Sequence, residues 1–263
     1  MPTRSQSYSA VDIVRYALTL EHLEDKFYRE GFANFTVDHA HETAHLQFIT
    51  AALHSMGQTP TMECAYAFGI TSVDEFVATA GIFEGIGQAA YAGAATQIAH
   101  KQILAAGLSI ATVEARPNAY LRASLAQSPF SQKMDDELTP DLHRVVSGWQ
   151  PTCPVKAFPG NTIATTGTII SGQVLSVHTE GFVLKAADAN AHLYAAFMTA
   201  TGADCADGIN LQITVPTNVN GQSYLLMSNC NTTVNDNCVT ADPTYIEISI
   251  LTHNETEIEP LNL

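Results

Sequence analysis

Five side chains in the first half of the sequence have the types and the spacing of a metal site. Glu42 and His45 are three residues apart, so a helix would place both on one face. A Glu-x-x-His pair that projects into the core of a helical bundle forms half of a two-metal carboxylate site. The other ligands of such a site are single glutamates from two further helices and a second Glu-x-x-His pair. The sequence offers three more glutamates in helical segments, Glu21, Glu84 and Glu114.

One residue departs from this pattern. Pro117 stands three positions after Glu114, where a second pair would have histidine. Proline cannot coordinate a metal, and inside a helix it removes a backbone donor and crowds the carbonyl of Val113. We therefore expect a kink that tilts Glu114 away from its partners. One metal position would keep His45 and shared carboxylates, the other would have oxygen ligands alone, and at most one ion would be tightly held.

Helices must position these side chains. Apolar residues spaced three and four apart predict four helices, at residues 9–31, 36–56, 72–99 and 101–126. Short connections within the first two and the last two helices predict antiparallel hairpins. The segment 57–71 is long enough to cross the length of a bundle between the hairpins. Residues equidistant from a hairpin turn lie at one height, and both Glu21 with Glu42 and Glu84 with Glu114 meet this condition.

Four carboxylates in a bundle core would repel one another and be costly to desolvate, so protons, a cation or a metal must neutralise them. Oxygen and imidazole donors suit iron, manganese or zinc.

The plainer interpretation of one Glu-x-x-His pair is a solvated helix face, and that of Glu24 and Asp25 is surface charge. Tyr28 shares a face with Glu21, where core packing and a redox or hydrogen-bonding role are equally good interpretations. As residues beside the ligands we consider Tyr28, Glu24 and Gln88. Five more histidines are interpreted as ordinary side chains: His22, His39, His41, His54 and His100.

A second pattern follows the helices. We predict a helical bundle at 1–128, a proline-rich connector at 129–160 and a small β-sandwich at 161–263, which is an α plus β fold in separate domains. In the last region apolar and polar residues alternate, as is typical of half-buried strands. Asn220-Gly221 predicts a tight hairpin turn between two such strands.

Composition narrows the classes of function. The formal net charge is −15 at pH 7, so the chain lacks the basic stripe that nucleic-acid binding needs, and we expect no nucleic-acid partner. It contains no run of about 20 apolar residues, so we expect no membrane span. The first residues do not form a signal peptide, so either the protein is intracellular or a leader is absent from this sequence. The oligomeric state stays open.

Cysteines and sequons favour a secreted or cell-surface protein. The five cysteines form no CxxC pair, which makes a cysteine zinc site a poor interpretation. Glycosylation sequons begin at Asn34, Asn231 and Asn254. Cys230 and Cys238 are eight residues apart, and we expect them to form a disulfide that closes a small loop.

In combination these motifs resemble those of fungal secreted ferritin-like proteins, which are grouped with stress-response and desiccation-related proteins. The resemblance spans nearly the whole chain and is carried by the segments 17–28, 41–45, 84–87, 113–116, 128–130, 153–159 and 220–224. It implies a ferritin-like four-helix bundle, a β-rich C-terminal region and export. It also implies, position by position, a ligand set of Glu21, Glu42, His45, Glu84 and Glu114. It implies no defined activity, so whether the chain is an enzyme stays open.

Two classes of function follow. The first is a ferritin-like protein that binds one or two ions of iron or manganese, with peroxide or oxygen chemistry if it is active. The second is a non-enzymatic stress or cell-surface protein with a degenerate site, whose β-domain binds a protein or a cell-wall polymer. Pro117 favours the second class, and the metal content of the native protein discriminates between them.

Overall fold

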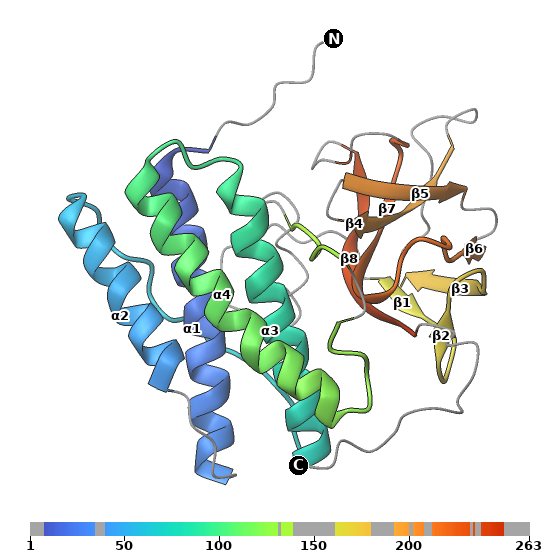
Figure 1. The fold of residues 1–263 in the computed structure, drawn as a ribbon, viewed down its shortest axis with the longest axis horizontal. Coiled ribbons are helices and arrows are strands. Elements are labelled where there is room, and N and C mark those ends of the chain that lie inside the picture. The colour runs from blue at the N-terminus through green and yellow to red at the C-terminus, as the bar shows by residue number, and fades with distance from the viewer. Residues whose placement is uncertain are drawn as a thin grey trace.

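The chain folds into a helical half and a β half, which lie side by side (Figure 1). The structure, a computed structural model, describes residues 8–34, 40–130, 133–138, 161–179, 192–199, 202–207, 212–231, 234 and 238–249. Most of the predicted connector 129–160 and the sequon at Asn254 lie outside these residues. Among the described residues, no helix is long and apolar enough to cross a membrane.

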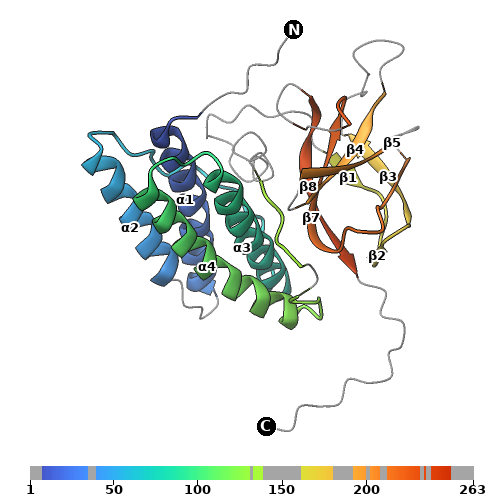
Figure 2. The same cartoon turned by 45° about the horizontal axis from the view of Figure 1, so that its top comes forward.

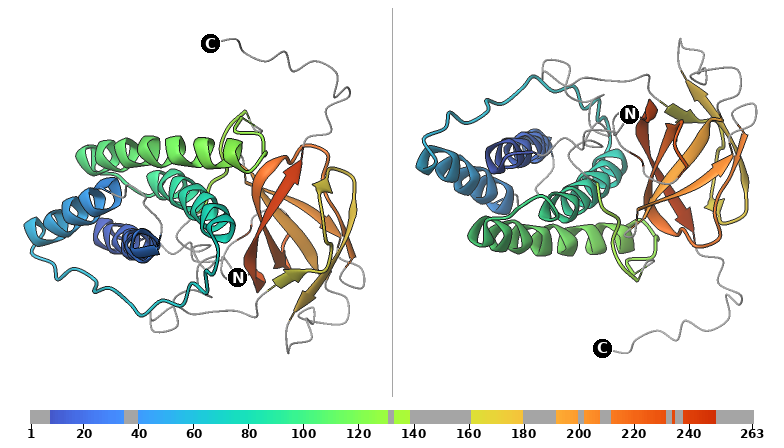
Figure 3. Two further views of the ribbon diagram at one scale, coloured as in Figure 1. Left: turned by 90° about the horizontal axis from the view of Figure 1, so that it is seen from below. Right: turned by 90° about the horizontal axis from the view of Figure 1, so that it is seen from above.

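The helical half contains α1 (Ala10–Asn34), α2 (Ala40–Ser55), α3 (Val73–Ala95) and α4 (Lys101–Ser124). These helices correspond to the four predicted ones. The segment between α2 and α3 runs along the bundle, so that α2 and α3 point in the same direction (Figures 1 and 3). Ser72 caps α3, because its side chain accepts a hydrogen bond from the backbone N–H of Glu75 at 3.2 Å. Two antiparallel hairpins joined by one long crossover make the ferritin-like topology.

Pro117 does not move Glu114 out of the bundle core. Helix α4 continues through Pro117 to Ser124, and Glu114 is fully buried. The expected tilt of Glu114 away from its partners is therefore wrong. One residue after the proline, the Asn118 side chain donates to the carbonyl of Gly81 in α3 at 3.1 Å. Such contacts hold α4 against α3.

The β half is a small sandwich of two sheets (Figure 3). One sheet has the strand order β1-β3-β6 and the other β2-β8-β7-β4-β5. An apolar core between them includes Leu175, Phe197, Ile213, Leu225 and Ile246. The strands are β1 (Asn161–Ile163), β2 (Ile169–Ile170), β3 (Val174–Thr179), β4 (Tyr194–Thr199), β5 (Gly202–Asp207), β6 (Gln212–Thr214), β7 (Gly221–Ser228) and β8 (Val239–Ser249).

The hairpin predicted at Asn220-Gly221 is wrong. Strand β6 pairs with β3, whereas β7 pairs with β4 and β8 in the other sheet. Gly221 has a φ of 76° and begins β7. The dipeptide does mark a backbone with positive φ, which glycine adopts without strain. It cannot specify which strands pair on either side, because that depends on contacts with distant strands.

The predicted disulfide is present. Cys230 and Cys238 are bonded, with their Cα atoms 5.5 Å apart, and link the end of β7 to the start of β8. Cys64 is disulfide-bonded as well. Of the two other sequons, Asn231 is exposed next to the disulfide, and Asn34 is the last residue of α1.

The two halves share an apolar cluster. Tyr224 and Leu226 of β7 pack with Phe83 and Ile86 of α3, the helix that faces the five-stranded sheet (Figure 2). Glu247 of β8 accepts two hydrogen bonds from the guanidinium of the buried Arg122, at 2.7 and 2.8 Å. These contacts fix α3 and α4 against the sheet, while α1 and α2 lie on the far side.

Gln222 of β7 makes polar contacts with both α3 and α4. Its side chain donates to the carbonyl of Ile82 at 3.3 Å and accepts from Asn118 at 3.2 Å. A Cβ atom on Gly85 would overlap the Gln222 amide, so the absence of a side chain at Gly85 allows sheet and helix to meet this closely. Gly81, one turn earlier, would place its Cβ at ordinary contact distances of 3.6 and 3.7 Å.

We predict that Gly85→Ala destabilises the protein by about 1–3 kcal/mol, because Gln222 must move and give up its hydrogen bonds. Gly81→Ala is the matched control and should be neutral or stabilising, since alanine is the better helix former. Urea denaturation of both variants measures the difference. Equal stability of the two variants would show that the close approach at Gly85 has no energetic role.

Candidate metal centre

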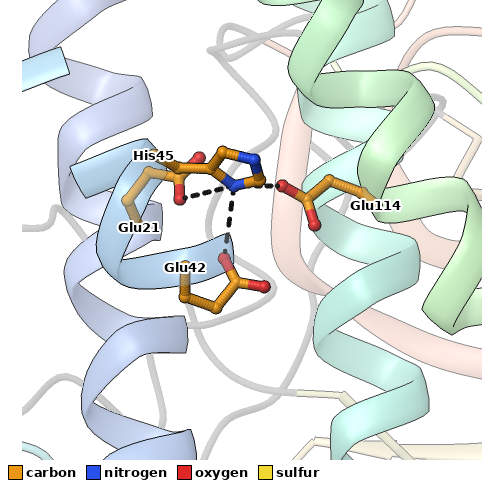
Figure 4. A group of neighbouring side chains, drawn as sticks. All are labelled: Glu21, Glu42, His45 and Glu114. Atoms are coloured by element: carbon orange, nitrogen blue, oxygen red, sulfur yellow. Dashed lines mark ion pairs between the residues drawn. The ribbon is translucent and has the colours of Figure 1, made fainter. Parts of the chain in front are cut away.

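The five predicted ligands converge between the four helices. Glu21 on α1, Glu42 on α2, Glu84 on α3 and Glu114 on α4 each have a relative exposure of 0%, and His45 on α2 has 9%. The Nδ1 atom of His45 lies 3.4 Å from Glu21, 3.5 Å from Glu42 and 3.0 Å from Glu114 (Figure 4). Spacing within each helix and equal height within each hairpin thus predicted the convergence of side chains that are up to 93 positions apart in the sequence (from 21 to 114).

A second group of ligand atoms lies beside the first. It consists of His41, Glu42, Glu84 and Glu114, and its atoms all lie within 4.8 Å of one another. The Nε2 atom of His41 is 2.7 Å from Glu42 and 3.8 Å from Glu84. His41, which was interpreted as an ordinary side chain, therefore lies among the candidate ligand atoms. The missed signal is its position four residues before His45, which places both imidazoles on one helix face.

Two tyrosines hold the outer glutamates by reciprocal hydrogen bonds. The hydroxyl of Tyr28 on α1 donates to Glu84 on α3, and the hydroxyl of Tyr91 on α3 donates to Glu21 on α1. Tyr28 therefore has the hydrogen-bonding role that was one of its two interpretations. Tyr91 was not predicted, although it follows Glu84 by seven residues, as Tyr28 follows Glu21. Each bond fixes one carboxylate oxygen and leaves the other oxygen for a ligand.

Two acidic residues interpreted as surface charge are buried instead. Glu24 is 2% exposed and Asp25 is 5% exposed. Asp25 accepts a hydrogen bond from Arg29 at 2.6 Å and another from Thr43 at 2.7 Å. Glu24 lies against α3, where a Cβ on Gly87 would come within 2.8 Å of its Oε1 atom. Spacing on one helix could not reveal this, because Glu24 meets α3 and Asp25 meets Thr43 of α2.

Gln88 is the third residue considered as a neighbour of the ligands. It lines a cavity of about 240 Å³, which also contacts Asn118, Gln222 and Tyr224. This places it near the contact between the bundle and the sheet. A role beside the ligands stays a prediction.

The carboxylates of the cluster are not neutralised by hydrogen bonds. Within the described part of the chain, both oxygens of Glu42 and of Glu114, and one oxygen each of Glu21 and Glu84, lack a hydrogen-bond partner of good geometry. The imidazole nitrogens are close to these oxygens, but they do not approach in hydrogen-bonding directions. Because buried polar atoms nearly always have a partner, this arrangement fits the surroundings of a cation. The donor set of carboxylate and imidazole fits iron or manganese.

Without a cation, bound protons must neutralise part of the negative charge of the carboxylates. Burial raises the pKa of Glu114 to about 9 and that of Glu21 to about 7. The adjacent carboxylate of Glu42 raises the pKa of His41 to about 10. Burial lowers the pKa of His45, but the surrounding carboxylates outweigh this effect and raise it to about 12. The metal-free cluster therefore retains protons at neutral pH that a metal would displace.

Comparison with known proteins agrees with the geometry. Residues 9–127 match the family model of the ferritin-like domain, a range that begins beside α1 and ends just after α4. A comparison with the curated proteins finds no match. The helical half is thus a ferritin-like domain with a buried carboxylate and histidine cluster that is compatible with metal binding.

We predict that the metal-free protein loses thermal stability as the pH rises from about 5 to about 9. Glu21, Glu114, His41 and His45 have raised pKa values, so they hold protons in the folded state that the unfolded chain has already released. Their stabilisation is present at low pH and is lost through this range. The raised pKa values of Glu24 and Glu84 act in the same direction.

The measurement is the Tm of chelator-treated protein across that pH range. Glu114→Gln removes one titrating group and should flatten the profile. A Tm that rises steadily with pH in the metal-free wild type would contradict this description of the cluster. The lowered pKa of Glu42 has the opposite effect on stability, but this effect falls at pH values below the ordinary carboxyl pKa.

Proposed function

We propose that the protein binds iron or manganese in the core of its ferritin-like domain. The observation that carries this proposal is the set of four fully buried glutamates beside two imidazoles. Six of their eight carboxylate oxygens lack a hydrogen-bond partner in the described structure. A buried carboxylate without compensation costs several kcal/mol, and a protein that did not bind a cation would gain stability from apolar residues in these positions.

The residues divide by position. Glu21 and His45 occur in the first group of ligand atoms alone, so they would be ligands of one ion. Glu42 and Glu114 occur in both groups and would be shared. Tyr91 would orient Glu21 through its hydrogen bond. When bound, iron or manganese supplies one-electron redox chemistry, which would give the site a role in handling oxygen or peroxide.

The chemistry of the donors supports a transition metal. Calcium and magnesium prefer oxygen ligands throughout, whereas imidazole suits iron, manganese, zinc or copper. The described cluster contains no thiolate, the ligand that would favour zinc or copper(I). Four carboxylates with two imidazoles favour the harder ions of this set, which are iron and manganese.

The rival function, a binding or structural protein with a degenerate site, depended on the effect of Pro117. Glu114 stays in the cluster, and His41 faces it, so the site retains carboxylates from all four helices. We therefore favour metal binding. Export stays part of the proposal, supported by the Cys230–Cys238 disulfide and the exposed sequon at Asn231. A role in stress response is proposed on the resemblance alone. A protein or cell-wall partner of the β half is proposed on the resemblance alone.

We predict that protein purified without chelator contains iron or manganese, and that Glu42→Gln lowers the affinity for Mn(II) at least about tenfold, because it neutralises a carboxylate shared by both ligand groups. Elemental analysis and calorimetric titration with Mn(II) are the measurements. Glu30→Gln, which changes a carboxylate outside the cluster with 51% exposure, is the matched control and should bind as the wild type does. Wild-type protein that binds neither Mn(II) nor Fe(II) would overturn the proposed function.

A further inference from the structure

We infer that the bundle core holds a second metal position, whose imidazole ligand is His41 from α2 in place of the histidine that α4 lacks at Pro117. This inference rests on the proposed metal-binding function and deepens it. The two positions would share Glu42 and Glu114, with Glu21 and His45 on one side and Glu84 and His41 on the other.

The first argument is the internal symmetry of the cluster. The α1–α2 hairpin contributes Glu21 with Tyr28, and the α3–α4 hairpin contributes Glu84 with Tyr91, at the same separation. Each tyrosine donates to the glutamate of the other hairpin. Exchanging the hairpins therefore maps the surroundings of Glu21 onto those of Glu84.

The symmetry fails at the imidazole. His45 stands three residues after Glu42, and the equivalent residue after Glu114 is Pro117. On this ground alone, the Glu84 side would have oxygen ligands only. The structure places the Nε2 atom of His41 there, 2.7 Å from Glu42 and 3.8 Å from Glu84. A side chain from the first turn of α2 thus occupies the side of the cluster where α4 offers no nitrogen.

The second argument is that an ion pair with His41 does not satisfy these carboxylates. Tyr28 takes one oxygen of Glu84, and the other oxygen is buried without a hydrogen-bond partner in the described structure. Both oxygens of Glu42 are in the same condition, although His41 is close to one of them. Three fully buried carboxylates and one imidazole nitrogen therefore point at a common space, as ligands around an ion do.

His41 is also more exposed than His45. The side chain of His41 is 30% exposed and that of His45 is 11% exposed. The imidazole rings lie with their centroids 6.1 Å apart. The second position would therefore be the one nearer to solvent, and its ion would exchange faster than the ion beside His45.

The test is titration of the chelator-treated full-length protein with Mn(II), followed by calorimetry and electron paramagnetic resonance. We expect two Mn(II) ions per chain and a spectrum that shows coupling between neighbouring ions. His41→Ala should bind one ion, with the coupling lost and the affinity of the second position reduced at least about tenfold. His54→Ala changes an exposed histidine on the same helix and should retain both ions and the coupling.

The far-ultraviolet circular dichroism spectrum checks that each variant is folded. His41→Gln keeps a polar side chain at this position and should also bind one ion. A wild type that binds no Mn(II) would refute the proposed function itself. A wild type with a single ion, or a folded His41→Ala protein that keeps two coupled ions, would refute the second position while leaving the first intact. Loss of both ions in folded His41→Ala would also refute the assignment of His41 to a separate position.

Discussion

The mutual repulsion of carboxylates in the bundle core is the constraint on which the rest of the helical half depends. Glu21, Glu42, Glu84 and Glu114 are fully buried, each from a different helix. In a buried site, neighbouring carboxylates can coexist only if a cation or bound protons neutralise them. The bundle therefore needs imidazoles beside the carboxylates, hydroxyl donors that fix their orientation, and helices that hold them in place.

Helix α3 shows how closely this core is tied to the β half. In the run Glu84-Gly-Ile-Gly, Glu84 faces the cluster, while the adjacent Gly85 admits the Gln222 amide of β7. Gly87 in turn leaves room for Glu24 of α1. A side chain at either glycine would displace the Gln222 amide or the Glu24 carboxylate. The sheet thus covers the outer face of the helix that carries one of the ligands, and Arg122 with Glu247 closes the same interface.

Much of this arrangement could be predicted from the sequence, because it follows from local periodicity. The four helices, the crossover and the convergence of five ligands depend on spacing within a helix and on equal height in a hairpin, and both are visible in the chain. The alternation of Ile246 and Ile248 with Glu247 likewise predicted a strand with one buried face. In the structure, the polar residue of that strand meets the bundle.

What could not be predicted depends on contacts between distant elements. The burial of Glu24 requires α3, and the pairing of β6 and β7 with different sheets requires strands far along the chain. The effect of Pro117 was overestimated, because the hold of α3 on α4 is not visible in the sequence of α4. His41 could have been found by its spacing from His45, but its facing Glu84 depends on how the two hairpins pack.

Anomalous X-ray diffraction at the manganese absorption edge, on crystals of the full-length protein loaded with Mn(II), would locate the ion directly. We predict anomalous density between Glu42 and Glu114, within coordination distance of His45 Nδ1. Crystals of fully loaded protein with no anomalous density inside the bundle, and with the ion bound on the surface, would contradict it.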